Sequence, residues 1–467
     1  MKTVDLVYFD AGGGHRAAAL ALQEAIHREG RPWRLRLVHL AKVLDPQDRF
    51  RRATGFAPED VYNKRLARGW TLGLGQELKL LQGMIRLAHG RLVQQLASHW
   101  AATEPDLVVS LVPNFNRALG ESLRCALPGV PFVTVMTDLV DLPPHFWIEP
   151  EAGQHLVCGS GRAEAQARAA GLPPTHIHRV SGMLLHPDFH APLPLDRAAE
   201  RRALGLDPER PVGVVMFGGQ GSMQMLRIAR QLSDEPLILL CGHNAVLAER
   251  LRALRGPQPQ VVVGYTREVV RWLRLADYFV GKPGPGCLSE ALHLGLPVIT
   301  FRNAWTMPQE RPNTDWIRDE GLGLVLRSVD ALPDAVRALR SDWDGWRARV
   351  ARCENRAVFE VSALIERLLA RAERPQAVDW IGAVAHARTC ARTCARRCAR
   401  RCARTCARER RRGPAAVRSG RRRRVLVDPG AGRASGCACA LRSRISSRPS
   451  SCSTSAVRLS TQSPSLQ

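Results

Sequence analysis

The chain has 467 residues, of which 45% are hydrophobic, and it carries a formal net charge of +25 at pH 7. The length allows two or three domains, and the hydrophobic fraction is typical of a globular protein. From residue 371 to the end there are 23 arginines, no lysine and four acidic residues, so most of the positive charge lies in this last segment.

The sequence predicts neither a membrane-spanning helix nor a signal peptide. No stretch reaches about 18 uninterrupted apolar residues, and Asp5 and Asp10 interrupt the first apolar run. Eight of the 13 cysteines lie in the last segment. The other five are scattered, without the spacing of a disulfide framework or a metal site, so we expect a reducing compartment.

Short β-branched runs alternate with longer helical patterns, which predicts parallel sheets covered by helices. The pattern begins with a strand at 4–9 and a helix at 16–28, and it restarts after the proline-rich stretch at 187–194. We therefore predict an α/β protein of two Rossmann-like domains, at 1–190 and 200–370, that face each other across a cleft. The other predicted strands are 35–40, 107–111, 132–136, 155–158, 212–217, 237–241, 261–263, 278–280 and 297–301.

The first glycine turn reads FDAGGGHR at 9–16, between the first strand and the first helix. Its spacing differs from GxGxxG, which disfavours a dinucleotide site. A helix N-terminus disfavours imidazolium, so His15 is expected to stay a neutral base. A single histidine is more often structural, but this position favours a catalytic role.

Between Lys64 and Trp100 the sequence has six basic residues and one acidic residue. One interpretation is an interfacial helix that docks on anionic lipid, and the other is a helix that packs on the first sheet. We predict docking, through Trp70, Lys79, Arg86 and Arg91. The apolar stripe that either interpretation requires consists of Leu78, Leu81, Ile85, Ala88, Leu92 and Leu96.

Two further glycine-rich loops follow predicted strands of the second domain. FGGQGS at 217–222 opens a helix, so its amide groups are placed to hold a pyrophosphate, although a plain strand–helix turn is equally consistent. GKPGPG at 281–286 leads into a helix in which Glu290 lies one turn from the start. A carboxylate there is suited to accept hydrogen bonds from ribose hydroxyls, although acidic residues also favour a first turn without any ligand.

The last segment repeats cysteine every four residues from Cys390 to Cys406, among arginines, and ends in a serine-rich stretch. It has too few apolar residues to offset the entropy of an ordered chain. We predict a disordered tail at 385–467. The alternatives are a basic arm that binds nucleic acid or anionic lipid, and a cysteine cluster that binds metal.

Taken together, the motifs resemble the family of monogalactosyldiacylglycerol synthases and processive diacylglycerol glucosyltransferases. The resemblance covers roughly residues 4–370, and the ordered set is more specific than any single motif. The matching segments are GGGHR at 12–16, TDL at 137–139, CGHN at 241–244, GYT at 264–266, GKPGPGCLSE at 281–290 and PQE at 308–310.

This resemblance implies a GT-B fold, a UDP-sugar donor and inversion at the anomeric carbon, with no metal and no other cofactor. It implies that His15 deprotonates the acceptor hydroxyl, that Glu290 holds the ribose, and that Gln309 and Glu310 contact the transferred sugar. The segment around 140–147 and the linker at 181–187 depart from the family pattern and leave the acceptor open. The remaining donor-binding residues on this basis are Gly14, Gly218, Gly219, Gly221, Ser222, Asn244, Gly264, Tyr265, Gly284, Pro285 and Gly286.

We therefore predict an inverting glycosyltransferase that moves a hexose or N-acetylhexosamine from a UDP-sugar to a diacylglycerol-like hydroxyl. It is expected to act as a peripheral protein on the cytoplasmic face of an anionic membrane, without specific nucleic-acid binding. One alternative is transfer to a polyprenyl or lipopolysaccharide intermediate, and another is a UDP-sugar 2-epimerase of the same fold. Outside the enzymes, the alternative is a basic nucleic-acid-binding protein.

Overall fold

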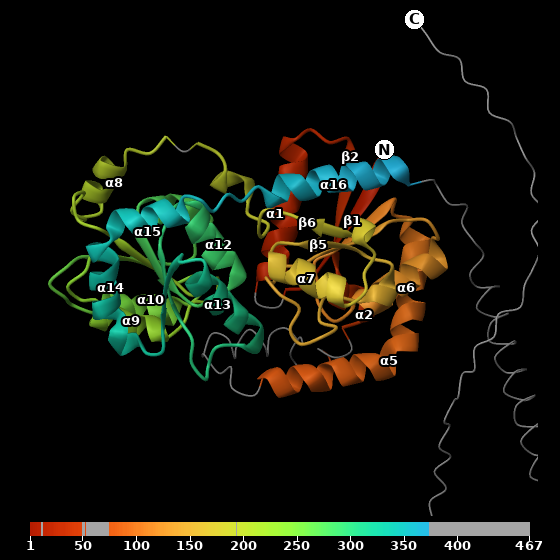
Figure 1. Cartoon of the computed structure of the whole chain (residues 1–467), viewed down its shortest axis with the longest axis horizontal. Helices are drawn as coiled ribbons and strands as arrows, with labels where there is room; N and C mark the ends of the chain where they lie inside the picture. The colour runs from red at the N-terminus through yellow and green to blue at the C-terminus, as the bar shows by residue number, and fades with distance from the viewer. Residues whose placement is uncertain (11–12, 49–51, 53–73, 193, 373–467) are drawn as a thin grey trace, which may run out of the picture. The chain divides into compact units, whose positions relative to one another are not determined.

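The computed structural model describes residues 1–10, 13–48, 52, 74–192 and 194–372. Within them, two parallel six-stranded sheets follow one another along the chain, each covered by helices (Figure 1). This arrangement confirms the predicted α/β class and the pair of Rossmann-like sheets. Trp70 and the tail predicted at 385–467 lie outside the described residues.

The first sheet has the strand order β2-β1-β3-β4-β5-β6. Its central strands are buried on both faces, as expected for a parallel sheet between helix layers. Valine and leucine dominate these strands because branched side chains pack well on a pleated surface. The strands are β1 (Lys2–Tyr8), β2 (Trp33–His39), β3 (Leu107–Ser110), β4 (Phe132–Val135), β5 (His155–Cys158) and β6 (Ile177–Arg179).

The second sheet repeats the plan with the order β12-β11-β10-β7-β8-β9. All of its paired strands are again parallel. Its core is a continuous cluster of buried apolar side chains from the strands and the helices that cover them. The strands are β7 (Gly213–Met216), β8 (Leu237–Leu240), β9 (Gln260–Val263), β10 (Tyr278–Gly281), β11 (Val298–Phe301) and β12 (Gly323–Leu326).

The helices connect successive strands and place their apolar faces on the sheets. In the first half they are α1 (Gly14–Arg28), α2 (Leu40–Leu44), α5 (Leu74–Thr103), α6 (Asn116–Ala126) and α7 (Gly161–Ala169). In the second half they are α8 (Arg197–Ala203), α9 (Gln224–Gln231), α10 (Ala245–Arg252), α11 (Val269–Arg274), α12 (Pro285–His293), α13 (Arg311–Asp319), α14 (Leu332–Ser341) and α15 (Trp343–Val350).

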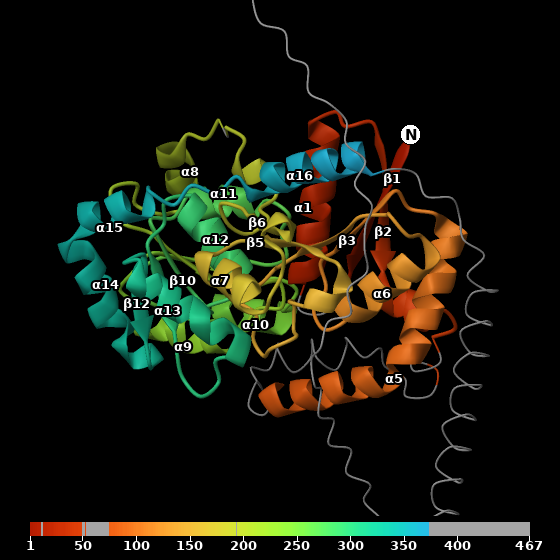
Figure 2. The same ribbon diagram turned by 45° about the vertical axis from the view of Figure 1, so that its right-hand side comes forward.

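The last described helix, α16 (Ala357–Arg371), returns to the first half of the chain. Its apolar side chains join the cluster formed by β1 and α1, and both views show it beside α1 (Figure 1 and Figure 2). The segment predicted as a second domain at 200–370 thus ends with a helix that completes the core of the first. At this crossing, the Asn355 side chain donates a hydrogen bond to the Met183 carbonyl oxygen at 3.0 Å.

The strand orders fix where ligands are expected to bind. In each sheet the first strand along the chain has neighbours on both sides, β1 between β2 and β3, and β7 between β10 and β8. Connections leave in opposite directions at such a point, which opens a crevice beyond the carboxyl ends of the strands. The loops that follow β1, β3, β7 and β10 therefore border the crevices, and those after β1, β7 and β10 carry the glycine motifs.

Candidate active site

A large cavity lies between the loops of the two sheets. It measures about 1240 Å³ and is lined by residues from both halves, including His15 and Asp138 from the first and Gly218 and Glu290 from the second. Pockets for one small molecule commonly measure about 300–1,000 Å³. The space therefore suits two substrates together better than one.

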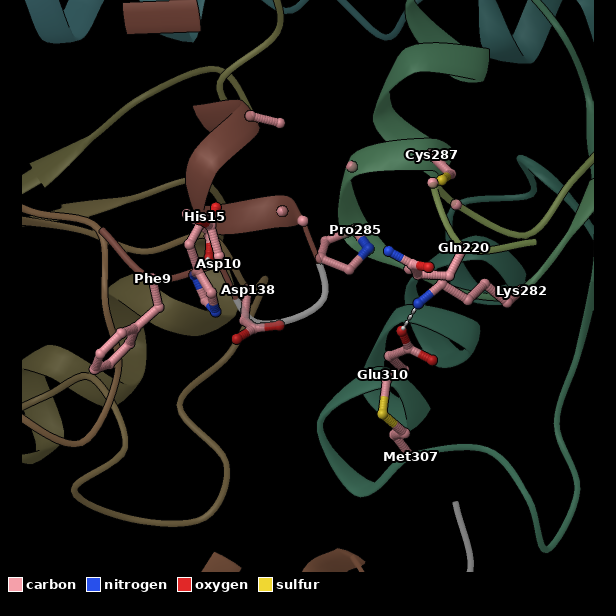
Figure 3. Close-up of a pocket in the computed structure, with 18 of the residues that line it drawn as sticks. Phe9, Asp10, His15, Asp138, Gln220, Lys282, Pro285, Cys287, Met307 and Glu310 are labelled. Carbon is pink, nitrogen blue, oxygen red and sulfur yellow. Dashed lines mark hydrogen bonds and ion pairs between the residues drawn. The ribbon is translucent and has the colours of Figure 1, made fainter. Parts of the chain in front are cut away.

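His15 lies in the first turn of α1, where the loop after β1 opens into the cavity (Figure 3). The preceding Gly13 has a φ of +80°, a left-handed conformation that glycine adopts without strain. The His15 Nδ1 atom lies 3.0 Å from the Thr137 hydroxyl oxygen. Withdrawal from water lowers the pKa of His15 to about 4, although a main-chain hydrogen bond with Leu111 opposes this shift. The imidazole is therefore neutral at pH 7 and able to accept a proton.

Asp138 lies on the same wall of the cavity as His15 and Asp10 (Figure 3). Its carboxylate accepts a hydrogen bond from the Trp147 indole nitrogen at 3.0 Å. Withdrawal from water, together with the nearby negative charge of Glu310, raises the pKa of Asp138 to about 7. An acid–base group is thus held beside His15. The TDL motif indicated this position, but the predicted set of site residues did not include it.

The opposite wall is built from the turn after β7 and from the start of α12. Gly218 and Gly221 both have positive φ angles. A side chain at the neighbouring Gly242 would place its Cβ 2.2 Å from the Gly219 carbonyl oxygen, so the two loops require glycine to approach one another. Because first-turn amides have no partner within a helix, the start of α12 at Pro285 is suited to bind phosphate oxygens.

Lys282 stands between these two loops. Its side chain passes close to Gly218 and Gly284, and its ammonium group forms an ion pair with Glu310 at 3.0 Å (Figure 3). The predicted set of site residues did not include Lys282, although it lies in the quoted GKPGPG loop. Two glycine turns and a lysine together form a positively polarised surface suited to a diphosphate.

Two further side chains border the same wall. Glu290 lies one turn into α12, and withdrawal from water raises its pKa to about 7. Tyr265 stacks on His243 with ring centroids 4.0 Å apart, and its ring lines the cavity. An aromatic ring supported from behind is suited to contact a nucleobase.

The cavity brings together nearly all of the predicted catalytic and donor-binding residues. Asn244 is the exception among them, because its side chain accepts a hydrogen bond from the Leu247 amide and caps α10. Asparagine is a preferred N-cap residue, so the structure gives this motif residue a structural role. The predicted residues that line the cavity are Gly14, His15, Gly218, Gly219, Gly221, Ser222, Gly264, Tyr265, Gly284, Pro285, Gly286, Glu290, Gln309 and Glu310.

The exposed face of the basic helix α5 is not the one that was predicted. The predicted stripe packs inward: Leu96 is fully buried, and most of the others are half-buried. The exposed large apolar residues of α5 are Leu80, Leu81, Met84 and Leu87, and of these only Leu81 belongs to the predicted stripe. The predicted stripe is therefore mainly a packing face, and a second apolar face is exposed. Lys79, Arg86 and Arg91 are exposed too, and they lie outside the cavity lining.

The described residues contain neither a candidate metal site nor a helix able to span a membrane. In these parts of the chain, no three His, Cys, Asp or Glu side chains are grouped so as to hold a metal ion. None of the described helices combines the length and the apolar character that crossing a bilayer requires.

Comparison with known proteins identifies relatives along most of the chain. The probable monogalactosyldiacylglycerol synthase 2 of Oryza sativa subsp. japonica is 30% identical over 344 residues, which cover 69% of this chain and 70% of the relative. Monogalactosyldiacylglycerol synthase 3 of Arabidopsis thaliana is 27% identical over 366 residues, which cover 73% and 74%. No family model matches the sequence.

The fold recurs in a solved glycosyltransferase structure. The glycotransferase of kitacinnamycin superposes with a TM-score of 0.52 at 16% identity, over 79% of this chain and 98% of that protein. This similarity agrees with the two facing Rossmann-like sheets of a GT-B enzyme. Together with the two synthase relatives, this shared fold shows that the chain belongs to the monogalactosyldiacylglycerol synthase family of GT-B glycosyltransferases.

Proposed function

We propose that this glycosyltransferase moves a hexose from a UDP-sugar to the free hydroxyl of a diacylglycerol at a membrane surface. The names of the synthase relatives support a galactosyl donor and a diacylglycerol acceptor. The observation that carries the proposal is the cavity itself, which places the neutral His15 opposite the glycine turns and the start of α12. One base and one diphosphate-binding wall are what direct transfer to an alcohol requires.

In the proposed reaction the acceptor oxygen attacks the anomeric carbon of the sugar while His15 removes the proton from that oxygen. The bond between the anomeric carbon and the diphosphate oxygen breaks, and UDP leaves with the electron pair. A single displacement of this kind inverts the anomeric configuration. The Thr137 hydroxyl beside Nδ1 holds the orientation of the imidazole.

The departing UDP develops negative charge on its terminal phosphate. The turn at Gly218–Gly221 and the first turn of α12 offer main-chain amides to this charge, and Lys282 adds a full positive charge. These groups occupy fixed positions before the reaction, so little reorganisation is needed as the bond breaks. We propose this electrostatic support in place of a metal ion.

The membrane surface enters the proposal through α5. Exposed apolar residues on this helix lie next to exposed Lys79, Arg86 and Arg91. A basic, partly apolar helix is suited to lie in the interface of an anionic bilayer. The acceptor would then pass to the enzyme directly from the bilayer, without crossing water.

Turnover by the full chain tests the proposal. We expect UDP release and a new glycolipid when vesicles contain diacylglycerol and the correct UDP-hexose is supplied. The H15A variant should lose about 10³-fold in kcat while its affinity for the UDP-sugar, measured by calorimetry, stays within twofold. Full activity of H15A would show that His15 is not the catalytic base.

The same assay separates the alternatives. Transfer only to a polyprenyl or lipopolysaccharide acceptor would keep the enzyme class and change the acceptor. Conversion of the UDP-sugar without any acceptor would instead identify an epimerase.

A further inference from the structure

Leu81 belongs both to the cavity wall and to the outer surface of the molecule. Its side chain lines the cavity and is still 39% exposed. Leu78, one turn earlier on α5, also lines the cavity, and it packs against the buried cluster that contains Phe146 and Trp147. Leu80, which precedes Leu81 on α5, is 66% exposed and does not line the cavity, so the cavity wall and the outer surface of this helix are adjacent here. Helix α5 lies at the lower border of the described fold in Figure 2.

The inner end of this wall is apolar and lies near His15. Phe9 directly follows β1 and forms an edge-to-face pair with Phe115, with ring centroids 5.5 Å apart. Both rings line the cavity, as does Leu44 at the end of α2. Phe9 appears on the same side of the cavity as His15 in Figure 3. Apolar side chains of the lining thus extend from the neighbourhood of His15 to α5, alongside charged lining residues such as Asp45 and Glu77.

The outer end of this apolar lining continues as an exposed stripe. Leu80, Met84 and Leu87 are spaced by four and three residues, so they share one face of α5. Leu87 is 91% exposed and Met84 is 53% exposed. Exposed apolar stripes on soluble surfaces mark contacts with a membrane or with another protein. The stripe begins next to Leu81, which lines the cavity.

The wall is held in place before any ligand binds. The buried side chain of Gln82 points inward from α5 and donates hydrogen bonds to the Asn114 side chain at 3.1 Å and to the Pro144 carbonyl oxygen at 3.4 Å. These contacts tie the helix to the loops after β3 and β4. A preformed groove costs little ordering entropy when a flexible chain enters it.

We propose that this groove, lined by Phe9, Leu44, Leu78, Leu81 and Phe115, binds an acyl chain of the lipid acceptor. The inference rests on the proposed function. The stripe of Leu80, Met84 and Leu87 is the entrance through which the chain leaves the bilayer. From Leu78 to Leu87 the helix rises about 14 Å, comparable with much of a long acyl chain. A protein partner on the stripe alone would leave the inner apolar lining uncovered, whereas an acyl chain covers both.

The first test uses diacylglycerols of short and long chain length in mixed micelles with the full-length protein. The wild type should show a lower KM for the long-chain acceptor. The L81Q variant should raise that KM about tenfold, the cost of losing one leucine contact. Its KM values for the short-chain acceptor and for the UDP-sugar should change less than twofold. Because Leu81 is partly exposed, this substitution is compatible with folding.

V246Q is the matched control, since Val246 is an exposed apolar residue on α10 of the other half. It should keep the wild-type preference for long chains. An unchanged preference in L81Q as well would overturn the groove. If the wild type transfers sugar to no diacylglycerol, the proposed function is wrong. A second measurement, which does not depend on turnover, therefore tests the groove by itself.

That measurement is photolabelling with a diacylglycerol that carries a diazirine at the end of one chain. We expect the label on the α5 peptides that contain Leu78 and Leu81, and less label in L81Q. Label on α5 without any sugar transfer would support the acyl-chain groove and contradict the proposed function. Label confined to other surfaces, including that of an added protein partner on the stripe, would overturn the groove.

Discussion

Under the proposed function, we expect Lys282 to neutralise charge on the leaving diphosphate. It lies between the loops of Gly218 and Gly284 and pairs with Glu310. The positive charge of Lys282 would stabilise the transition state, in which the bond between the sugar and the diphosphate breaks. K282M should therefore lower kcat by about 10²–10³-fold. Steady-state kinetics and calorimetry of UDP binding measure the effect. E310Q provides the comparison, since it removes the ion pair and leaves the lysine, and a K282M enzyme with normal kcat would contradict this role.

Asp138 makes the stability of the protein depend on pH. Its pKa is about 7 in the folded chain, against about 3.8 when unfolded, so the folded state holds an extra proton between these values. The stabilising contribution is therefore present below pH 4 and is lost as the pH rises through 7. The full loss is on the order of 4 kcal/mol.

The D138N variant tests this dependence, because asparagine still accepts the Trp147 hydrogen bond and does not ionise. Relative to the wild type, D138N should gain stability from pH 5 to pH 8. Urea denaturation at both pH values gives the two differences in unfolding free energy. Equal differences at pH 5 and pH 8 would show that Asp138 does not titrate in this range.

Site residues in glycine motifs could be predicted because a glycine-rich turn between a strand and a helix commonly binds anions through its main-chain amides. The predicted turn at Gly218–Ser222 and the loop at Gly284–Gly286 line the cavity. Asp138 and Lys282 were not included, because an isolated acidic or basic residue in a sequence gives no sign that it lines a cavity. Asn244 shows the opposite case, since a motif residue serves as a helix cap. The chemical roles of the site residues stay predictions.

Helix α5 presents a basic surface that is expected to act at a membrane. Reversing charge at Lys79, Arg86 and Arg91 with glutamate should weaken co-sedimentation with anionic vesicles at least tenfold at low salt. The difference should shrink as salt is raised, because exposed charges are screened. Glutamate at Arg230, Arg250 and Arg252, which are exposed on α9 and α10, is the matched control. Equal losses in both triple variants would point to net charge and not to α5.

Most strands could be predicted from their apolar runs, often to within a residue or two at each end. The prediction missed β6 (Ile177–Arg179) and β12 (Gly323–Leu326), one of the two edge strands in each sheet. Strand β6 contains His178 and Arg179, and an edge strand with polar residues lacks the buried pattern of a central one. The exposed face of α5 was missed because apolar residues occur on more than one side of that helix.

The two halves of the molecule are joined by two chain crossings that hydrogen-bond to each other. The Ser181 amide donates to the Glu360 carboxylate at 2.7 Å, and the Arg356 amide donates to the Ser181 hydroxyl at 2.6 Å. The sequence predicted the first crossing from its prolines. It did not predict the second, because helical periodicity in α16 does not indicate which sheet the helix covers.

The return of α16 has a consequence for how the protein is made. Side chains from Ala357 to Leu369 fill the core beside β1 and α1, which leave the ribosome long before them. During translation the first half must wait for nearly the whole body of the enzyme before its apolar surface is covered. A ribosome that stalls inside the second half releases a chain whose first half still displays that surface, a target for chaperones and proteases. Full synthesis is thus a condition for burying the core that supports His15.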